Sequence, residues 1–487
     1  MRVCHLVATT LGATWMFEQL RELRDQHGYE VSAVVNSYEG PLVDLLRSES
    51  IPFHVCEFGL VGPSRARSMF FDIFRLARHF RAERYDVVQS HIFVTALVGR
   101  PAAWLAGVPA RLAMIAGPFH LEAPASRLVE RLTWWMDTTL VPSCEKSLRL
   151  CRAMGIPSSR LRLIYYPVDT VARFAPEQIA PSGLRAQFGW AEDTPVILLS
   201  AYFYPRLGDG GWIPSTLRGQ AVKGHEDLIR AAPLVLQSFP NARFVLAGGA
   251  FAGATGFLDE MKALADEMGL GGLVVFTGHR SDVPAVLRDA TIAVQASLCE
   301  NLGGTLEALS MRKPMVVTRV GGMVDAVRDG ETGLLANPRD PADLARKICE
   351  LLKDPERAQR MGDRGRDLIE REFSLRKTAT DLDTLYREEI ARTQSRIPYS
   401  FSLGLLRVAY GIPWLAFVWL RARLQEQGGG WGRLMARGVA IRLRSRARLT
   451  VSAFERGAYK AWTVMAPIPI RRLARRMRRR RPAKASA

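Results

Sequence analysis

Short apolar segments alternate with amphipathic segments along most of this 487-residue chain, and this alternation limits the possible folds more than any other feature. The first unit reads RVCHLVAT, MFEQLRELRDQHG and YEVSAVVN, which predicts strand, helix and strand, with Gly28 as the helix C-cap. YDVVQSH, TALVGRPAAWLAG, ARLAMIAG, a helix over 126–133, TTLVPS and EKSLRLCRAMG continue the pattern. Since alternating strands and helices form parallel sheets covered by helices, residues 1–172 are expected to form one Rossmann-like domain.

A proline-rich stretch over 168–194, which contains APEQIAPSG, interrupts the alternation and predicts an interdomain linker. A second series opens with PVILLSAYF and continues through HEDLIRAAPLVLQSF, ARFVLAGG, GLVVFTG and IAVQAS to PMVVTR and TGLLA. This series predicts a second doubly wound domain over 173–374. The segment TDLDTLYREEIART is expected to cross back to the first domain within a helix over 375–395.

The formal net charge of +19 is confined to the end of the chain. Residues 396–487 contain 21 Lys and Arg against 2 Asp and Glu, whereas the first 395 residues contain 46 of each sign. Within this tail, the apolar segment 399–420 is long enough to span a bilayer but contains Arg407, Gly404, Gly411 and Pro413, which favours an interfacial or re-entrant segment.

Arginine-rich runs interleaved with aromatic residues follow this segment and are typical of a helix among anionic headgroups. Arginine clusters also bind nucleic acids, but the tryptophan-rich apolar block favours lipid. We therefore expect residues 396–487 to form a basic amphipathic helical tail that binds an anionic membrane surface, and we expect no nucleic acid partner.

The N-terminus and the cysteines favour a cytoplasmic location. MRVCHLVATT runs directly into a strand, without the apolar region and cleavage site of a signal peptide. The six cysteines are scattered and form no Cys-x-x-Cys pair, as is typical in a reducing cytosol. Together with the basic tail, these features predict a protein held peripherally at the inner face of the plasma membrane.

One glycine-containing motif has the features of a phosphate-binding turn. In SLCENLGGTLEAL, Gly303 and Gly304 lie between a strand and a helix, where free backbone N–H groups and the helix dipole attract phosphate. Glu300 precedes the turn and Glu307 lies in the first helical turns, where carboxylates can accept hydrogen bonds from sugar and ribose hydroxyls. A capped helix with a surface glutamate would show the same pattern.

Other polar residues also follow predicted strands. Lys223 in VKGHEDLI precedes a glycine-led helix start, where an ammonium group can neutralise the charge on a departing nucleoside diphosphate. His91 after YDVVQS and His120 after AGPF fit a structural role at a strand end as well as a role in an active site. The pair Asp381 and Asp383 falls in a late helical stretch and is interpreted as helix surface rather than a metal site.

Ten motifs, taken in order, resemble the retaining glycosyltransferases of family 4, which have the two-domain GT-B fold. They are DVVQSH, AGPFH, VPS, IYYPVD, VKGHEDLI, ARFVLAGG, VVFTGHRSDVP, ENLGGTLEAL, KPMVVTRVGGMVDAV and DGETGLLANP. The resemblance spans residues 1–390 and implies an α/β protein with two Rossmann-like domains facing across a cleft.

Position by position, the resemblance implies that Lys223 and a nearby arginine bind the donor diphosphate, that Glu307 holds the ribose and that Glu300 contacts the donor sugar. His120 matches the active-site histidine of the N-terminal domain. The family's donor-binding turn corresponds to Gly303, Gly304 and Thr305. The resemblance further implies front-face substitution with retention, without a metal ion or another cofactor.

The sequence departs from the family pattern in three places. Six residues separate the two glutamates, where the family usually has seven. The insertion YPRLGDGGWIPSTLRGQA replaces a short loop that carries one arginine, so Arg206 and Arg218 are both candidates for the diphosphate ligand; Arg218, five residues before Lys223, is favoured. TLGATWM stands where the family has a Gly-Gly loop, so Gly12 is the single glycine of this segment. Gly12 is a candidate donor-binding residue, and the segment can also shape the acceptor side.

The sequence thus predicts a glycosyltransferase that moves a sugar from a nucleotide-sugar, a UDP-sugar rather than a GDP-sugar, to a lipid-linked or polysaccharide acceptor in surface glycan biosynthesis. Two alternatives remain: another GT-B sugar-nucleotide enzyme such as an epimerase, and a nucleic-acid-binding protein acting through its tail. A dehydrogenase is disfavoured because neither domain-opening strand is followed by Gly-x-Gly-x-x-Gly.

Overall fold

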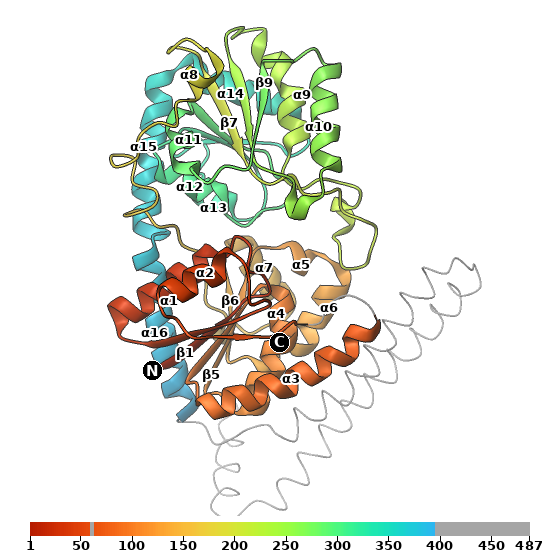
Figure 1. The fold of residues 1–487 in the computed structure, drawn as a ribbon, viewed down its shortest axis with the longest axis vertical. Helices are drawn as coiled ribbons and strands as arrows, with labels where there is room; N and C mark the ends of the chain where they lie inside the picture. Colours follow the sequence, from red (N-terminus) through yellow and green to blue (C-terminus); the bar gives the residue numbers. More distant parts are fainter. Residues whose placement is uncertain (59–62, 395–487) are drawn as a thin grey trace, which may run out of the picture. The chain divides into compact units, whose positions relative to one another are not determined.

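The computed structural model describes residues 1–58 and 63–394, which belong to one compact unit. Two six-stranded parallel sheets, each with helices on both faces, form this part of the chain (Figure 1). The two expected Rossmann-like domains are therefore confirmed. The expected basic tail and its apolar segment 399–420 lie outside the described residues.

The first sheet has the strand order β3-β2-β1-β4-β5-β6, which is that of a doubly wound fold. Its strands are β1 (Arg2–Leu6), β2 (Glu30–Val35), β3 (Phe53–Val55), β4 (Val87–His91), β5 (Ala110–Ile115) and β6 (Thr139–Pro142). Val3 of the central β1 lies opposite Val31 on one side and Val87 on the other. The central β4 is buried along its whole length, its polar residues Gln89 and Ser90 included, because helices cover both faces of the sheet.

The connections of the first half are helical. They are α1 (Thr14–His27), α2 (Pro41–Ser48), α3 (Pro63–Glu83), α4 (Ile92–Ala106), α5 (Phe119–Glu122), α6 (Pro124–Thr133), η1 (Trp134–Met136), α7 (Glu145–Ala153) and η2 (Ser158–Arg160). Gly28 ends α1 in the left-handed conformation with φ of 68°, which confirms the expected C-cap. The sequence interpretation assigned no element between residues 37 and 84, where the structure has α2, β3 and α3.

The second sheet repeats the arrangement in the order β12-β11-β10-β7-β8-β9. Its strands are β7 (Val196–Ser200), β8 (Arg243–Ala247), β9 (Val274–Gly278), β10 (Ile292–Gln295), β11 (Met315–Thr318) and β12 (Leu334–Ala336). Its helices are α8 (Leu184–Phe188), η3 (Ser215–Leu217), α9 (His225–Leu236), η4 (Phe251–Gly253), α10 (Gly256–Glu267), α11 (Val283–Asp289), α12 (Gly304–Ser310), α13 (Met323–Ala326), α14 (Pro341–Lys353) and α15 (Pro355–Glu372). None of the described helices combines the length and the apolarity needed to cross a membrane.

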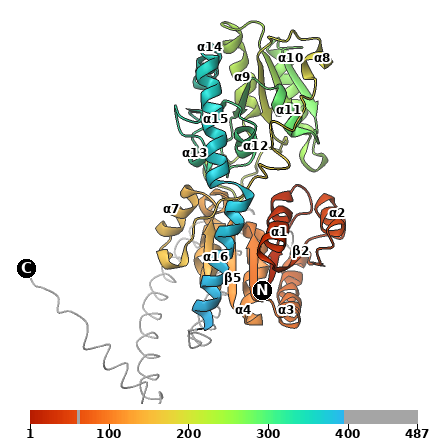
Figure 2. The same ribbon diagram turned by 90° about the vertical axis from the view of Figure 1, so that its left-hand side faces the viewer.

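The last described helix, α16 (Leu375–Gln394), packs against the first half of the chain, beside α1 (Figure 2). Leu382 and Tyr386 of α16 belong to the same buried cluster as the strands of the first sheet. The Tyr386 hydroxyl donates a hydrogen bond to Gln89 Oε1 of β4 at 2.7 Å. The two halves are thus joined twice, by the linker before β7 and by α16.

A buried arginine fixes the linker to the second half. The Arg366 guanidinium on α15 donates hydrogen bonds to the carbonyl oxygens of Phe174 at 2.6 Å, Ser310 at 2.7 Å and Thr170 at 2.8 Å. Because two of these carbonyls belong to the linker and one to the end of α12, one side chain joins α15 to both segments.

Replacing Arg366 by alanine is expected to lower the free energy of unfolding by about 3 kcal/mol, since it leaves three carbonyls without their charged donor. The matched control is Arg364→Ala, which removes an exposed arginine from the same helix. Urea denaturation of the full chain measures both variants. An Arg366→Ala midpoint equal to that of Arg364→Ala would show that the clamp contributes nothing to stability.

Candidate active site

A lysine and a glutamate from two loops of the second half form an ion pair beside the start of α12. Lys223 Nζ donates to Glu300 Oε2, and the two side chains are only 20% and 11% exposed. Glu300 Oε1 accepts a hydrogen bond from the Asn301 backbone N–H at 3.1 Å. The Lys223 ammonium also lies 5.6 Å from the ring centroid of Tyr204, so it faces both an anion and an aromatic surface.

Close backbone packing holds the two loops in place. The Leu298 N–H donates to the Val222 carbonyl at 2.8 Å, which joins the loop before α9 to the loop after β10. Gly224, with φ of 72°, lies so close to β10 that a Cβ there would be 1.9 Å from the Ala296 carbonyl oxygen. A Cβ at Gly321 would similarly lie 1.7 Å from the Glu300 carbonyl oxygen, so the VGG turn after β11 supports the Glu300 loop from the other side.

Lys223 is charged at neutral pH. Burial alone would lower the pKa of Lys223, but attraction to Glu300 and the hydrogen bond to it outweigh burial, so the pKa lies above the usual lysine value. A positive charge is therefore fixed next to the positive end of α12, where an incoming diphosphate would find both.

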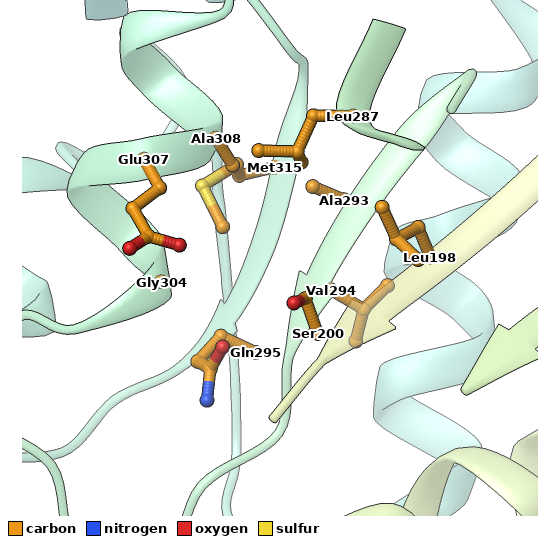
Figure 3. Close-up of a pocket in the computed structure, with 10 residues that line it drawn as sticks. All are labelled: Leu198, Ser200, Leu287, Ala293, Val294, Gln295, Gly304, Glu307, Ala308 and Met315. Atoms are coloured by element: carbon orange, nitrogen blue, oxygen red, sulfur yellow. The ribbon is translucent and has the colours of Figure 1, made fainter. Parts of the chain in front are cut away.

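Glu307 lies on the first turns of α12 above a small pocket between β7, β10 and β11. Figure 3 shows its carboxylate near Gly304, with Gln295 and Ser200 at the neighbouring strand ends. The hydroxyl of Thr305 on the same turn is buried and has no hydrogen-bond partner among the described residues. Burial raises the pKa of Glu307, and attraction to Arg173 opposes this rise.

Arg173 connects this carboxylate to the first half of the chain, a role that the sequence interpretation missed. Its guanidinium donates to Thr14 Oγ1 at 3.2 Å and lies 3.7 Å from the carboxylate of Glu18 on α1. Burial raises the pKa of Glu18 to about 7, although Arg173 lowers it. The signal available in the sequence was a basic residue a few positions after the motif IYYPVD.

His120 on α5 is a buried histidine whose Nε2 has no partner among the described residues. Burial lowers the pKa of His120 to about 4, so its ring is neutral at physiological pH. The ring stacks on Phe93, with centroids 5.0 Å apart. Buried polar nitrogens in proteins nearly always have a hydrogen-bond partner, which makes His120 Nε2 a candidate to bond a ligand atom.

Contacts between the two halves bring the His120 segment towards the Glu300 segment. A Cβ at Gly117, three residues before His120, would lie 3.2 Å from the Asn301 Cβ. Ser143, after β6, donates to Asn301 Oδ1 at 3.1 Å. Asn301 follows Glu300 directly, so the predicted residues of the two halves converge on the ENLGG turn.

The two candidate arginines differ in their surroundings. Arg206 pairs with Glu226 at 3.0 Å and also with Glu260, on the surface of α9 and α10. Arg218 is exposed after η3, four residues beyond Pro214 in the same insertion. Gly12 lies in an exposed loop between β1 and α1, with φ of 72°. These positions leave the roles of all three residues as predictions.

The insertion is an ordered loop that reaches the first half of the chain. The Leu207 N–H donates to the Gln220 carbonyl at 2.9 Å and the Leu207 carbonyl accepts from the Gly219 N–H at 2.7 Å, which closes the base of the loop. At its tip, the Gly211 carbonyl accepts from the Ala125 N–H of α6 at 3.1 Å. Trp212, beside Gly211, is 54% exposed, and its ring centroid lies 6.4 Å from that of Phe93. An exposed tryptophan is therefore held next to the Phe93–His120 stack.

His91 has a structural role in the described part of the molecule. Its Nε2 contacts His5 Nδ1 at 3.1 Å and its Nδ1 contacts the Tyr166 hydroxyl at 3.2 Å, all within the core below the sheet edge. His5 in turn contacts Tyr386 of α16 at 2.9 Å. Of the two interpretations that the sequence left open for His91, the structure supports the structural one.

Two parallel six-stranded sheets, with a Lys–Glu pair beside a glycine-led helix at one sheet edge, define the class of GT-B glycosyltransferases that use nucleotide-sugars. Two family models match the chain: "Glycosyl transferase 4-like domain" over residues 12–167 and "Glycosyl transferases group 1" over residues 212–368. The chain belongs to this family 4 type of glycosyltransferase.

Individual relatives agree with this assignment. The chain is 29% identical over 391 residues to a D-inositol 3-phosphate glycosyltransferase of Acidothermus cellulolyticus, covering 74% of this chain and 78% of the relative. It is 25% identical to the alpha-D-kanosaminyltransferase of Streptomyces kanamyceticus, covering 68% and 84%. Among solved structures, Anabaena HepE in complex with UDP and glucose matches with a TM-score of 0.65 at 19% identity, covering 80% of this chain and all of HepE.

Proposed function

We propose that this protein transfers a sugar from a UDP-sugar to a lipid-linked or polysaccharide acceptor in surface glycan biosynthesis, with retention at the anomeric carbon. The observation that carries the proposal is the partly buried Lys223–Glu300 pair beside the α12 turn. A fixed ammonium next to the N-terminal end of a helix suits a diphosphate, and an adjacent carboxylate suits a sugar hydroxyl. The UDP seen with HepE favours a uridine donor over a guanosine donor.

In the proposed reaction, the acceptor oxygen bonds to the anomeric carbon on the face from which the diphosphate leaves. The bond between that carbon and the diphosphate oxygen breaks, and the acceptor proton passes to the leaving phosphate oxygen. Lys223 and Arg218 stabilise the charge that grows on the diphosphate, so the transfer needs no metal ion. Glu307 accepts hydrogen bonds from the ribose, Glu300 orients the sugar, and His120 offers its unpartnered Nε2 to a sugar hydroxyl.

The location follows from the tail. Residues 396–487 carry the whole excess positive charge, and we propose that they hold the enzyme peripherally at the inner, anionic face of the plasma membrane. That position would give the cleft access to acceptors attached to lipid.

A screen of the full-length protein against UDP-, GDP- and ADP-sugars tests the donor. We expect thermal stabilisation by UDP and its sugars and release of UDP, with NMR of the product showing an unchanged anomeric configuration. Conversion of the donor into an epimer without transfer would support the epimerase alternative. Stabilisation by none of the nucleotides, with membrane lipid supplied, would contradict the proposed function.

Trp212 provides a prediction about the acceptor. Trp212→Ala is expected to lower the ratio of sugar transfer to donor hydrolysis about tenfold, because an aromatic face that contacts a sugar ring is lost while the donor site stays intact. Trp212→Phe retains an aromatic face and is expected to recover most of the ratio. Equal ratios of transfer to hydrolysis for the wild type and Trp212→Ala would show that Trp212 does not contact the acceptor.

A further inference from the structure

Helix α3 buries one face in the first half of the chain. Leu76, Ala77 and Phe80 of α3 pack in a cluster with Val98 and Ala102 of α4. These contacts fix the orientation of the helix, so its opposite face is directed away from the sheet.

That opposite face carries three exposed phenylalanines. Phe70, Phe71 and Phe74 are 58%, 64% and 50% exposed. The ring of Phe70 lies 4.9 Å from that of Phe74 and 6.0 Å from that of Phe71, so the three rings form one continuous apolar cluster. Contiguous exposed aromatic surface of this kind marks a site of interaction.

The aromatic cluster continues into a positively charged stripe. Arg75, Arg78 and Arg81 are exposed and follow the phenylalanines along the helix. Arg75 is paired with Asp72 of the same helix, so Arg78 and Arg81 supply the excess positive charge. The Arg81 guanidinium donates to the Leu105 carbonyl at 2.7 Å, which holds this charge on the surface. Over its whole length α3 has five arginines against two acidic residues.

We propose that the outer face of α3 docks on an anionic lipid surface, with the three phenylalanines among the acyl chains and the arginines at the headgroups. Apolar rings next to arginines are the pattern of an interfacial helix. Like-charge repulsion disfavours two other occupants: the tail 396–487 has an excess of 19 positive charges, and a second copy would bring two arginine stripes together. The contact adds a second membrane signal to the tail and is independent of the transfer chemistry.

A fluorophore on the helix tests this docking separately from binding by the tail. In the full-length chain, Phe71→Cys is labelled with an environment-sensitive dye and mixed with vesicles of phosphatidylglycerol and phosphatidylcholine. We expect a blue shift and quenching by a lipid-borne quencher, and neither effect with phosphatidylcholine alone. The matched control is Leu234→Cys, an exposed apolar position on α9, whose label should stay in water. Unsubstituted protein measures background labelling of Cys299, which is partly exposed.

A second variant tests the energetic contribution of the cluster. Combined Phe70→Ser, Phe71→Ser and Phe74→Ser substitutions should weaken binding to the anionic vesicles by about tenfold or more, with thermal stability unchanged because the rings are exposed. A label at 71 that remains in water while the protein sediments with the vesicles would overturn the proposal. A blue shift without vesicles would overturn it too, indicating a second copy if the shift depends on concentration and the tail if it does not.

Discussion

Lys223→Ala is expected to lower kcat for sugar transfer by about 10²–10³-fold, a loss typical of removing one fixed electrostatic partner of a developing charge. In the structure the ammonium is already held by Glu300, so it need not reorganise when the diphosphate departs. The substitution also leaves a buried carboxylate without its partner, and binding of UDP should weaken as well. Release of UDP under saturating donor, together with UDP titration, measures both effects.

The control for Lys223→Ala is Lys262→Ala, which removes an exposed lysine from α10 in the same half of the chain. This variant should transfer sugar at the wild-type rate. Lys223→Arg keeps a cation on a longer side chain and should retain part of the activity. A kcat for Lys223→Ala within threefold of that for Lys262→Ala would exclude Lys223 from leaving-group stabilisation.

Most of the fold could be predicted because its strands are buried on both faces. Strands such as β7 and β11 read as short apolar runs, and helices of the fold, such as α1, show a regular apolar face. The region that was not assigned contains α3, whose outer face is itself aromatic. An amphipathic pattern is hard to detect when both faces of a helix carry large apolar residues. The exposed phenylalanines that hide the pattern of α3 are the same residues that carry the proposed membrane contact.

The donor side of the candidate site was accessible from sequence because it consists of local motifs. Lys223 precedes Gly224, which allows the close approach of the Ala296 backbone, and Glu300 precedes Gly303, whose φ of 39° favours glycine. The pairing of Lys223 with Glu300 spans 77 positions and needed the fold.

Residues outside these motifs could not be predicted. Trp212 lies in an insertion with no periodic pattern, and the Gly211–Ala125 hydrogen bond and the Trp212–Phe93 ring contact show that it faces the first half of the chain. Arg173 lies in an irregular linker, where a single basic residue is ordinarily solvated. Both side chains acquire a partner through tertiary contacts with α1, α4 or α6, which local spacing does not encode.

Glu307→Gln is expected to weaken UDP binding by about tenfold to a hundredfold, because an amide replaces a charged acceptor of ribose hydrogen bonds. The pKa of Glu307 is raised by burial, so the unliganded carboxyl takes up a proton at a higher pH than an ordinary glutamate does. Below that pKa one of its oxygens becomes a donor. Affinity of the wild type for UDP should therefore fall as the pH is lowered through this pKa, and Glu307→Gln should lack that part of the dependence.

Titration calorimetry with UDP across the acidic to neutral range measures this dependence, with Glu331→Gln as the control at an exposed glutamate of the same domain. Arg173→Ala provides a directional test, because attraction to Arg173 lowers the pKa of Glu307. Without that attraction the midpoint of the pH dependence should move to higher pH, while the affinity at the alkaline end changes less. If Glu307→Gln and Glu331→Gln bound UDP with equal affinity and equal pH dependence, the ribose would have to be held by another residue, and the roles assigned along α12 would have to be revised.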